Sequence, residues 1–185
     1  EEIHKSGCNG GACHAQMYIM GSLLKYGSDI LKEKYLFDIA KGNLRLQAFG
    51  VTEPTSGTDT LSIQTRAKKK GNKYIINGQK VWTSRAEYSD LIMLLVKTNQ
   101  EAKDNKNSLS LFLIDMRQHL GKEIIIKPIR TMVNHSTTEI FFDNLEVDES
   151  CIIGEEGKGF KYILSGLNAE RLLIASECME MQNIL

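Results

Sequence analysis

The sequence predicts an α+β fold in which a β-barrel or β-sandwich domain in the middle of the chain is flanked by helices. Three observations predict it. Apolar residues recur every three or four positions between residues 11 and 41, the period falls to two between residues 44 and 147, and the helical period returns near residue 160. Many short strands between long helices favour one closed or sandwiched β domain over alternating β and α units.

Two helices are predicted in the first zone. Gly27 is the expected stop of the first helix, Ser28 is the expected N-cap of the second, and Gly42 is expected to end the second. The apolar positions are Ala15, Ile19, Leu23 and Tyr26 in the first helix and Ile30, Leu31, Tyr35 and Ile39 in the second. Each helix therefore has a face to bury.

The middle zone consists of short segments in which apolar residues alternate with polar ones or run together. This pattern predicts strands over residues 44–48, 61–67, 89–98, 108–115 and 137–147. A further strand-like segment, 73–84, contains Asn77-Gly78, a pair typical of a two-residue hairpin turn because both turn positions need positive φ. Gly71-Asn72 supplies another turn.

The last zone is a glycine-rich turn, residues 152–160, followed by one long helix from about Phe160 to the end. The apolar stripe of this helix consists of Phe160, Leu164, Leu167, Ile174, Cys178, Met181 and Leu185. Arg171 interrupts the stripe and Glu170 lies beside it. Because the chain lacks a starting methionine and no stop signal closes the helix, we expect it to be a piece of a longer protein.

Composition excludes several classes of function. Lysine and arginine number 23, as do aspartate and glutamate, so there is no basic excess to bind nucleic acid, and the apolar runs are too short to span a membrane. The four cysteines and four histidines lack metal-ligand spacing, so no metal site is expected. No secretory leader opens the sequence, and we therefore expect reduced thiols in an intracellular protein.

The segment FGVTEPTSGTDT, residues 49–60, holds more chemistry than a surface turn needs. It contains five hydroxyls, two glycines, a proline and two carboxylates. Pro54 fixes one dihedral angle, and Gly50 and Gly57 let a ligand approach the backbone closely. The amides and hydroxyls between them form an array of donors suited to an extended polar ligand. The alternative is a hydroxyl-rich turn that satisfies its own backbone.

Three motifs occur in one order and at matching spacing: VTEPTSGTD, NGQKVWTS and GEEGKGFKYILSGLNAER. Together they resemble the acyl-CoA dehydrogenases, and the likeness covers the whole chain. The resemblance implies that residues 1–43 end the N-terminal helical domain of that fold and residues 44–150 form its middle β domain, which binds flavin and acyl-CoA. Residues 151–185 would then begin its C-terminal helical domain.

The resemblance also implies that the loop binds FAD. Val51 and Thr52 would meet the pyrimidine edge of the isoalloxazine, Trp82 would pack against the ring, and Ser84 would hydrogen-bond near its N5 nitrogen. The residues implied to bind the cofactor are Phe49, Gly50, Val51, Thr52, Glu53, Pro54, Thr55, Ser56, Gly57, Thr58, Trp82, Thr83 and Ser84. The alternative for Trp82 is an ordinary core tryptophan, and Glu53 is more typical of a turn or capping group than of a catalytic acid.

In this family a carboxylate removes the proton α to the thioester carbonyl while the β hydrogen leaves as hydride to the flavin. GLNAER matches the L-x-x-E-R motif of a minority of relatives that carry the base on this helix, so Glu170 is implied as the base. The alternative is a solvated helix carboxylate, as expected of Glu177. The residues implied to contact the substrate are Thr58, Asn168, Ala169, Glu170 and Arg171, with Asn168 replacing an aspartate often found there.

The partners implied by the resemblance are an acyl-CoA substrate, which is oxidised to a 2-enoyl-CoA, and an electron-transferring flavoprotein. The full-length protein would be a homodimer or tetramer in the cytoplasm of a bacterium or the mitochondrial matrix of a eukaryote. Two alternatives stay open. The same fold supports acyl-CoA oxidases and related flavin monooxygenases, and a β domain that has lost catalysis would be a module that binds acyl-CoA or a protein.

Overall fold

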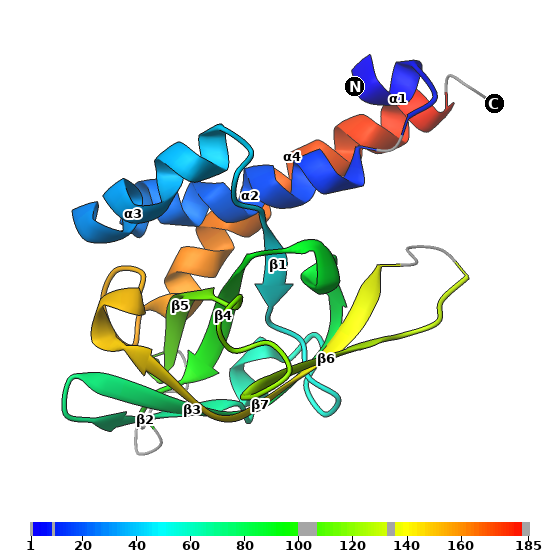
Figure 1. Cartoon of the computed structure of the whole chain (residues 1–185). Helices are drawn as coiled ribbons and strands as arrows, with labels where there is room; N and C mark the ends of the chain where they lie inside the picture. Colours follow the sequence, from blue (N-terminus) through cyan, green and yellow to red (C-terminus); the bar gives the residue numbers. More distant parts are fainter. Residues whose placement is uncertain (1, 9, 100–106, 133–135, 183–185) are drawn as a thin grey trace.

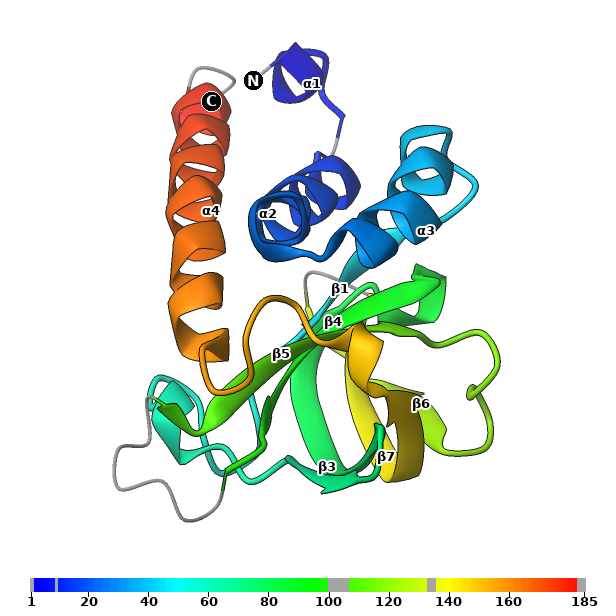
Figure 2. The same ribbon diagram turned by 90° about the vertical axis from the view of Figure 1, so that its left-hand side faces the viewer.

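The computed structural model describes residues 2–8, 10–99, 107–132 and 136–182. It is a mixed α+β structure, as the sequence predicts: a curled β-sheet lies below a layer of helices (Figure 1). The helices are α1 (Glu2–Lys5), α2 (Gly11–Tyr26), α3 (Asp29–Ala40) and α4 (Gly159–Gln182). Figure 2 shows α2 between α3 and α4, all on the same side of the sheet.

The sheet has seven strands in the described part of the chain. They are β1 (Leu46–Gly50), β2 (Arg66–Lys70), β3 (Lys73–Ser84), β4 (Leu91–Lys97), β5 (Leu109–Asp115), β6 (Ile124–Pro128) and β7 (Thr137–Asp148). Their order is β1-β4-β2-β3-β7-β6, and β5 also pairs with β4. β1 and β2 run parallel to β4, whereas the other pairings are antiparallel.

Strand β4 separates two parts of the hydrophobic core. Leu91, Met93 and Leu95 belong to a cluster that includes residues of α2, α3 and α4. The alternate residues Ile92 and Leu94 belong to a second cluster inside the curl of the sheet. Because both faces of β4 are buried, its sequence LIMLLV is continuously apolar and does not alternate.

The helix boundaries agree with the sequence prediction. Ser28 caps α3 by accepting a hydrogen bond from the Leu31 N–H (3.3 Å), and Gly27 follows the last residue of α2. Ile30 is an exception, because 64% of it is exposed although its neighbour Leu31 is buried. The predicted apolar stripe of α4 is not buried as a whole: Phe160 and Leu167 are partly buried, whereas Leu164, Ile174 and Cys178 are exposed. Leu185, and the Met181 side chain, lie outside the described residues.

Two predictions for the strands are wrong. Asn77-Gly78 is not a hairpin turn, because β3 continues through it and pairs with β7 on both sides. Gly78 is needed for close packing instead: a Cβ there would lie 2.6 Å from the Thr65 Cα. Residues 61–67 are also not one strand, since Thr60–Ser62 forms a 3-10 turn and β2 starts at Arg66.

Helices α2 and α4 approach closely at Gly166. A Cβ at this position would lie 3.1 Å from the Ser22 Oγ and 3.2 Å from the Tyr18 carbonyl oxygen. The Ser22 hydroxyl donates to the Tyr162 carbonyl (3.2 Å) and ties the two helices together. This contact joins the first half of α4 to α2, and Figure 2 shows the two helices side by side above the sheet.

Candidate functional site

A pocket of about 350 Å³ opens between α2, α4, β1 and the end of β3. It is lined by Tyr18, Gln47, Phe49, Val51, Thr52, Gly57, Thr60, Trp82, Ser84, Ile163, Leu167 and Glu170. The loop after β1, the VWTS segment of β3 and helix α4 all contribute to it. Residues from all three motifs therefore meet in one cavity.

Strand β1 supplies one wall through its alternation. Gln47, Phe49 and Val51 line the pocket, while Ala48 and Gly50 point the other way and are buried. A Cβ at Gly50 would lie 2.8 Å from a Leu94 methyl group, so a larger residue here would force the Leu94 side chain to move. The Phe49 ring also packs against Tyr18 of α2, with ring centroids 6.1 Å apart.

The loop that follows β1 is held by a buried ion pair. The Lys80 ammonium on β3 lies 2.8 Å from a Glu53 carboxylate oxygen, and neither side chain is more than 3% exposed. The same carboxylate accepts hydrogen bonds from the N–H groups of Gln64 (2.5 Å) and Thr65 (2.9 Å). Lys80 also donates to the Val51 carbonyl (3.0 Å). Glu53 thus faces away from the pocket, into the protein.

Both members of the pair carry charge at neutral pH. Burial raises the pKa of the Glu53 carboxyl, but Lys80 and the N–H donors outweigh this, and the net pKa lies below its ordinary value. Burial lowers the pKa of Lys80 to about 8 against the opposing effect of Glu53. The Glu53 carboxylate 2.8 Å away favours the charged form of the lysine, so we assign the pair as an ammonium beside an ionised carboxylate.

The remaining loop residues divide into pocket and solvent positions. Thr52 and Gly57 line the pocket, whereas Pro54, Thr55 and Thr58 are exposed and do not line it. Ser56 is buried; its N–H and carbonyl pair with those of Glu53 (3.1 and 3.0 Å), and its hydroxyl donates to the Asp59 carbonyl. Part of the loop therefore satisfies its own backbone, as the turn alternative expects, and part faces the cavity.

A β-bulge turns Trp82 into the pocket. On β3 the alternation would place Trp82 on the same face as Lys80, which is fully buried, but the register with β7 shifts between Lys80 and Thr83. Trp82 has φ of 60°, a left-handed conformation that is uncommon for residues other than glycine. As a result Trp82 is 58% exposed and lines the pocket, so it is not a core tryptophan.

The two residues after Trp82 point in opposite directions. Ser84 lines the pocket, while Thr83 is buried away from it. In the described part of the chain, the Thr83 Oγ1 has no hydrogen-bond partner, and its carbonyl accepts from the Thr138 hydroxyl (2.7 Å). Thr83 does not line the cavity in which the other two residues of this motif meet.

Helix α4 forms the wall opposite β1. Ile163, Leu167 and Glu170 are spaced by four and three residues, so they share the face that lines the pocket. Glu170 is half-buried. The other predicted substrate residues of this helix, Asn168, Ala169 and Arg171, are exposed and do not line the cavity, and the Arg171 guanidinium donates to the Asn168 side chain (2.8 Å).

Tyr18 of α2 and Glu170 of α4 line the same cavity. Burial raises the pKa of the Tyr18 phenol, and the negative charge of Glu170 raises it further, so the phenol stays protonated. Tyr18 comes from α2, outside the three motifs, and sequence reasoning missed it together with Gln47, Thr60, Ile163 and Leu167. The period of two from Phe49 to Gln47 could have indicated Gln47, but no local signal marks Tyr18.

Residues 48–145 match the family model of the acyl-CoA dehydrogenase middle domain, and this match covers more than half of the 185 residues. The chain belongs to the acyl-CoA dehydrogenase family. It is 33% identical to the mitochondrial long-chain specific acyl-CoA dehydrogenase of Mus musculus, over 95% of this chain and 41% of the mouse protein. It is 34% identical to the cyclohex-1-ene-1-carbonyl-CoA dehydrogenase of Syntrophus aciditrophicus, over 89% of this chain and 39% of that protein.

Solved structures show the same relationship. The acyl-CoA dehydrogenase of Geobacillus kaustophilus matches with a TM-score of 0.82 and 32% identity, over 88% of this chain and 42% of that one. A glutaryl-CoA dehydrogenase in complex with glutaryl-CoA matches with a TM-score of 0.81 and 29% identity, over 92% and 44%. The chain therefore spans less than half the length of these relatives.

The described residues hold no cluster of three or more histidine, cysteine, aspartate or glutamate side chains that could bind a metal ion. No helix among them has the length and apolarity needed to cross a membrane. Cys8, Cys13, Cys151 and Cys178 are all free thiols.

Proposed function

We propose that the full-length protein is an FAD-dependent dehydrogenase that converts an acyl-CoA thioester to a 2-enoyl-CoA. One observation carries the proposal: an exposed indole, a hydroxyl-bearing loop and a carboxylate from α4 line the same cavity. The named relatives act on CoA thioesters in both the mitochondrial and the bacterial examples.

The residues present fit an isoalloxazine ring. Trp82 offers a flat aromatic surface with 58% of its area exposed, and Phe49 adds a second ring on the β1 wall. Thr52 and Ser84 supply hydroxyls at the same cavity. We propose that these residues hold FAD. When bound, the flavin accepts the hydride that leaves the β carbon of the acyl group.

Glu170 is the proposed base. This carboxylate is half-buried and lines the cavity beside the apolar side chains of Ile163 and Leu167, where it can accept a proton from a bound acyl group. The protonated Tyr18 phenol on the opposite wall cannot compete for that proton. Glu170 thus removes the α proton and holds it.

The remaining parts of the proposal concern the whole protein. We propose the domain division at residues 43 and 150, and a homo-oligomer that passes electrons to an electron-transferring flavoprotein. One structure of similar fold carries that partner's name in its title, an electron-transferring flavoprotein of Acidaminococcus fermentans (29% identity, TM-score 0.82). The free cysteines and the mitochondrial name of the mouse relative support a location inside the cell or the mitochondrial matrix.

The test uses the full-length protein and Glu170→Gln, in which the carboxylate becomes an amide of the same shape. We expect the parent to bind FAD and its flavin to lose colour when acyl-CoA is added, and E170Q to do so at least about 100-fold more slowly. E177Q, on the same helix seven residues further along, is the control and should react like the parent. Equal bleaching by E170Q would show that the base lies elsewhere.

A second candidate function is oxidation with direct transfer of electrons to oxygen. A structure titled as the prolyl acyl carrier protein oxidase AnaB matches this chain with 28% identity and a TM-score of 0.83. Rapid reoxidation of the substrate-reduced flavin by air would favour an oxidase or a related monooxygenase. A colourless protein that binds acyl-CoA would instead favour the non-catalytic module.

A further inference from the structure

The buried Lys80–Glu53 pair lies behind the cofactor loop and has no role in the chemistry proposed above. Lys80 is fully buried, and its aliphatic stem packs against Gly50, where an added Cβ would lie 3.4 Å from the Lys80 Cγ. Burying two charges is costly, and the ion pair by itself is weak evidence of a gain in stability. The contacts of the Lys80 ammonium therefore suggest a positional role.

Those contacts converge on the segment that enters the pocket. Lys80 donates to the Val51 carbonyl (3.0 Å), and the next residue of β3, Val81, donates its N–H to the Thr52 carbonyl (2.9 Å). The Glu53 carbonyl accepts from the Ser56 N–H (3.1 Å). Two successive carbonyls of the loop are thus bound by β3, and the third is bound within the loop itself.

The Thr52 N–H points in the opposite direction to the Val51 carbonyl. In a trans peptide the carbonyl of one residue and the N–H of the next point in opposite directions, and the described chain has no cis peptide bond. With the Val51 carbonyl turned inward to Lys80, the Thr52 N–H points away from Lys80. Within the described residues it has no hydrogen-bond partner, and both Val51 and Thr52 line the pocket.

We propose that Lys80 is a positioning residue: held in place by Glu53, it orients the Val51–Thr52 peptide so that the Thr52 N–H can donate to an acceptor atom of the bound flavin. The inference rests on the proposed function, because it takes FAD as the ligand. It predicts that removal of Lys80 raises the FAD dissociation constant even in a protein that still folds.

The test compares E53Q with K80M/E53Q in the full-length apoprotein. Both have a neutral residue 53, so they differ only in Lys80, and methionine retains the length of the lysine stem. We expect the FAD dissociation constant, measured by titration of flavin fluorescence, to stay within about threefold of the parent in E53Q. It should rise by about tenfold in K80M/E53Q, as expected for one misplaced hydrogen-bond donor.

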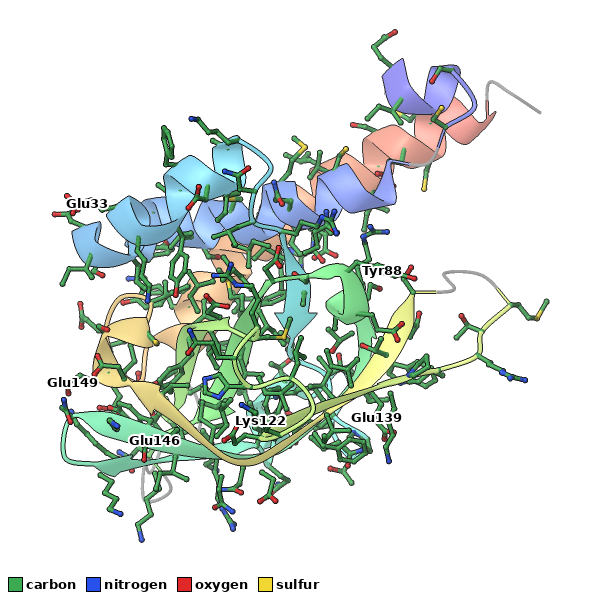
Figure 3. The ribbon with its side chains drawn as sticks, in the orientation of Figure 1. Glu33, Tyr88, Lys122, Glu139, Glu146 and Glu149 are labelled. Carbon is green, nitrogen blue, oxygen red and sulfur yellow. The ribbon has the colours of Figure 1, made fainter. Side chains whose placement is uncertain are left out.

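A surface pair on the same strand provides the control. Lys73 of β3 pairs with Glu146 of β7, both half-exposed, and Figure 3 shows Glu146 at the end of the sheet away from the helices. K73M/E146Q makes the same chemical change and should bind FAD like the parent. The FAD-induced rise in melting temperature separates the two effects, because it shrinks in K80M/E53Q only if the site itself has changed.

Equal FAD affinity in E53Q and K80M/E53Q, or an equal loss in K73M/E146Q, would overturn the assignment of Lys80. If K80M/E53Q does not fold, K80Q/E53Q takes its place with the same two outcomes, because a glutamine is one bond shorter than lysine and cannot make the same contact with the Val51 carbonyl. A parent protein that binds no FAD would refute the proposed function itself and, with it, this inference.

Discussion

At the scale of single residues, two buried threonines differ in whether their hydroxyl makes a hydrogen bond. Thr138 donates to the Thr83 carbonyl (2.7 Å), while the Thr83 hydroxyl, equally buried, has no partner in the described part of the chain. An unsatisfied buried hydroxyl costs about 1–3 kcal/mol, and a satisfied one contributes about 1 kcal/mol. The two positions should therefore respond oppositely to the same substitution.

We expect Thr83→Val to raise the free energy of unfolding by about 1 kcal/mol, because valine has the same shape without the unpaired oxygen. Thr138→Val should lower it by about 1 kcal/mol, because a hydrogen bond is lost. Urea unfolding of the ligand-free protein measures both. A loss of stability in T83V as large as in T138V would mean that the Thr83 hydroxyl has a partner after all.

At the scale of elements, the distance between α2 and α4 determines the width of the pocket. Gly166 allows the two helices to touch, and Glu170 lies one turn further along α4, opposite Tyr18. Neither helix forms the pocket by itself, because residues of both α2 and α4 line it. The pocket exists because a side chain of one helix faces a carboxylate of the other.

Gly166→Leu should push the helices apart, since even a Cβ at this position meets the Tyr18 backbone at 3.2 Å. We expect a loss of about 1–3 kcal/mol in the free energy of unfolding, together with weaker acyl-CoA binding. The matched control is Gly21→Ala on α2, where an added Cβ meets nothing within 4 Å. It should stabilise the helix by up to about 1 kcal/mol. Thermal unfolding and ligand titration of both variants check this, and unchanged behaviour of G166L would contradict it.

At the scale of the whole molecule, the buried ion pair links stability to acid pH. The pKa of Glu53 in the folded protein lies below the ordinary value of 4.5, so the folded state binds fewer protons than the unfolded state at this carboxyl. The stabilisation is complete above pH 4.5 and is lost as the pH falls through the lower, folded-state pKa. The same carboxyl also joins the loop to the segment before β2 through the N–H groups of Gln64 and Thr65.

We therefore expect the melting temperature of the parent to fall steeply below about pH 4.5, and the fall to be shallower in K80M/E53Q, which has no titrating group here. Scanning calorimetry between pH 3 and 7 measures the difference. E146Q is the control, because Glu146 is exposed on the surface and its replacement should leave the acid limb nearly unchanged. Identical curves for the parent and K80M/E53Q would show that Glu53 does not carry this dependence.

Much of the fold and part of the site could be predicted from the sequence. The structure contains the predicted helix cap at Ser28, the buried strand β4 and the turn at Gly71. Each of these depends only on residues close together in the sequence. The motifs predicted Trp82, Thr52 and Glu170, and these three side chains do line one cavity. Thr55, Thr58 and Arg171 carry the same motif signals but are exposed outside it.

What the sequence determined by itself is the order of helical and strand zones, their caps and the family motifs, because each of these depends on residues close together in the chain. Only the tertiary structure decided that Lys80 is buried against Glu53, that a bulge turns Trp82 outward, and that Tyr18 faces Glu170. These outcomes depend on contacts between residues 27 to more than 150 positions apart, which no period of two or 3.6 can encode.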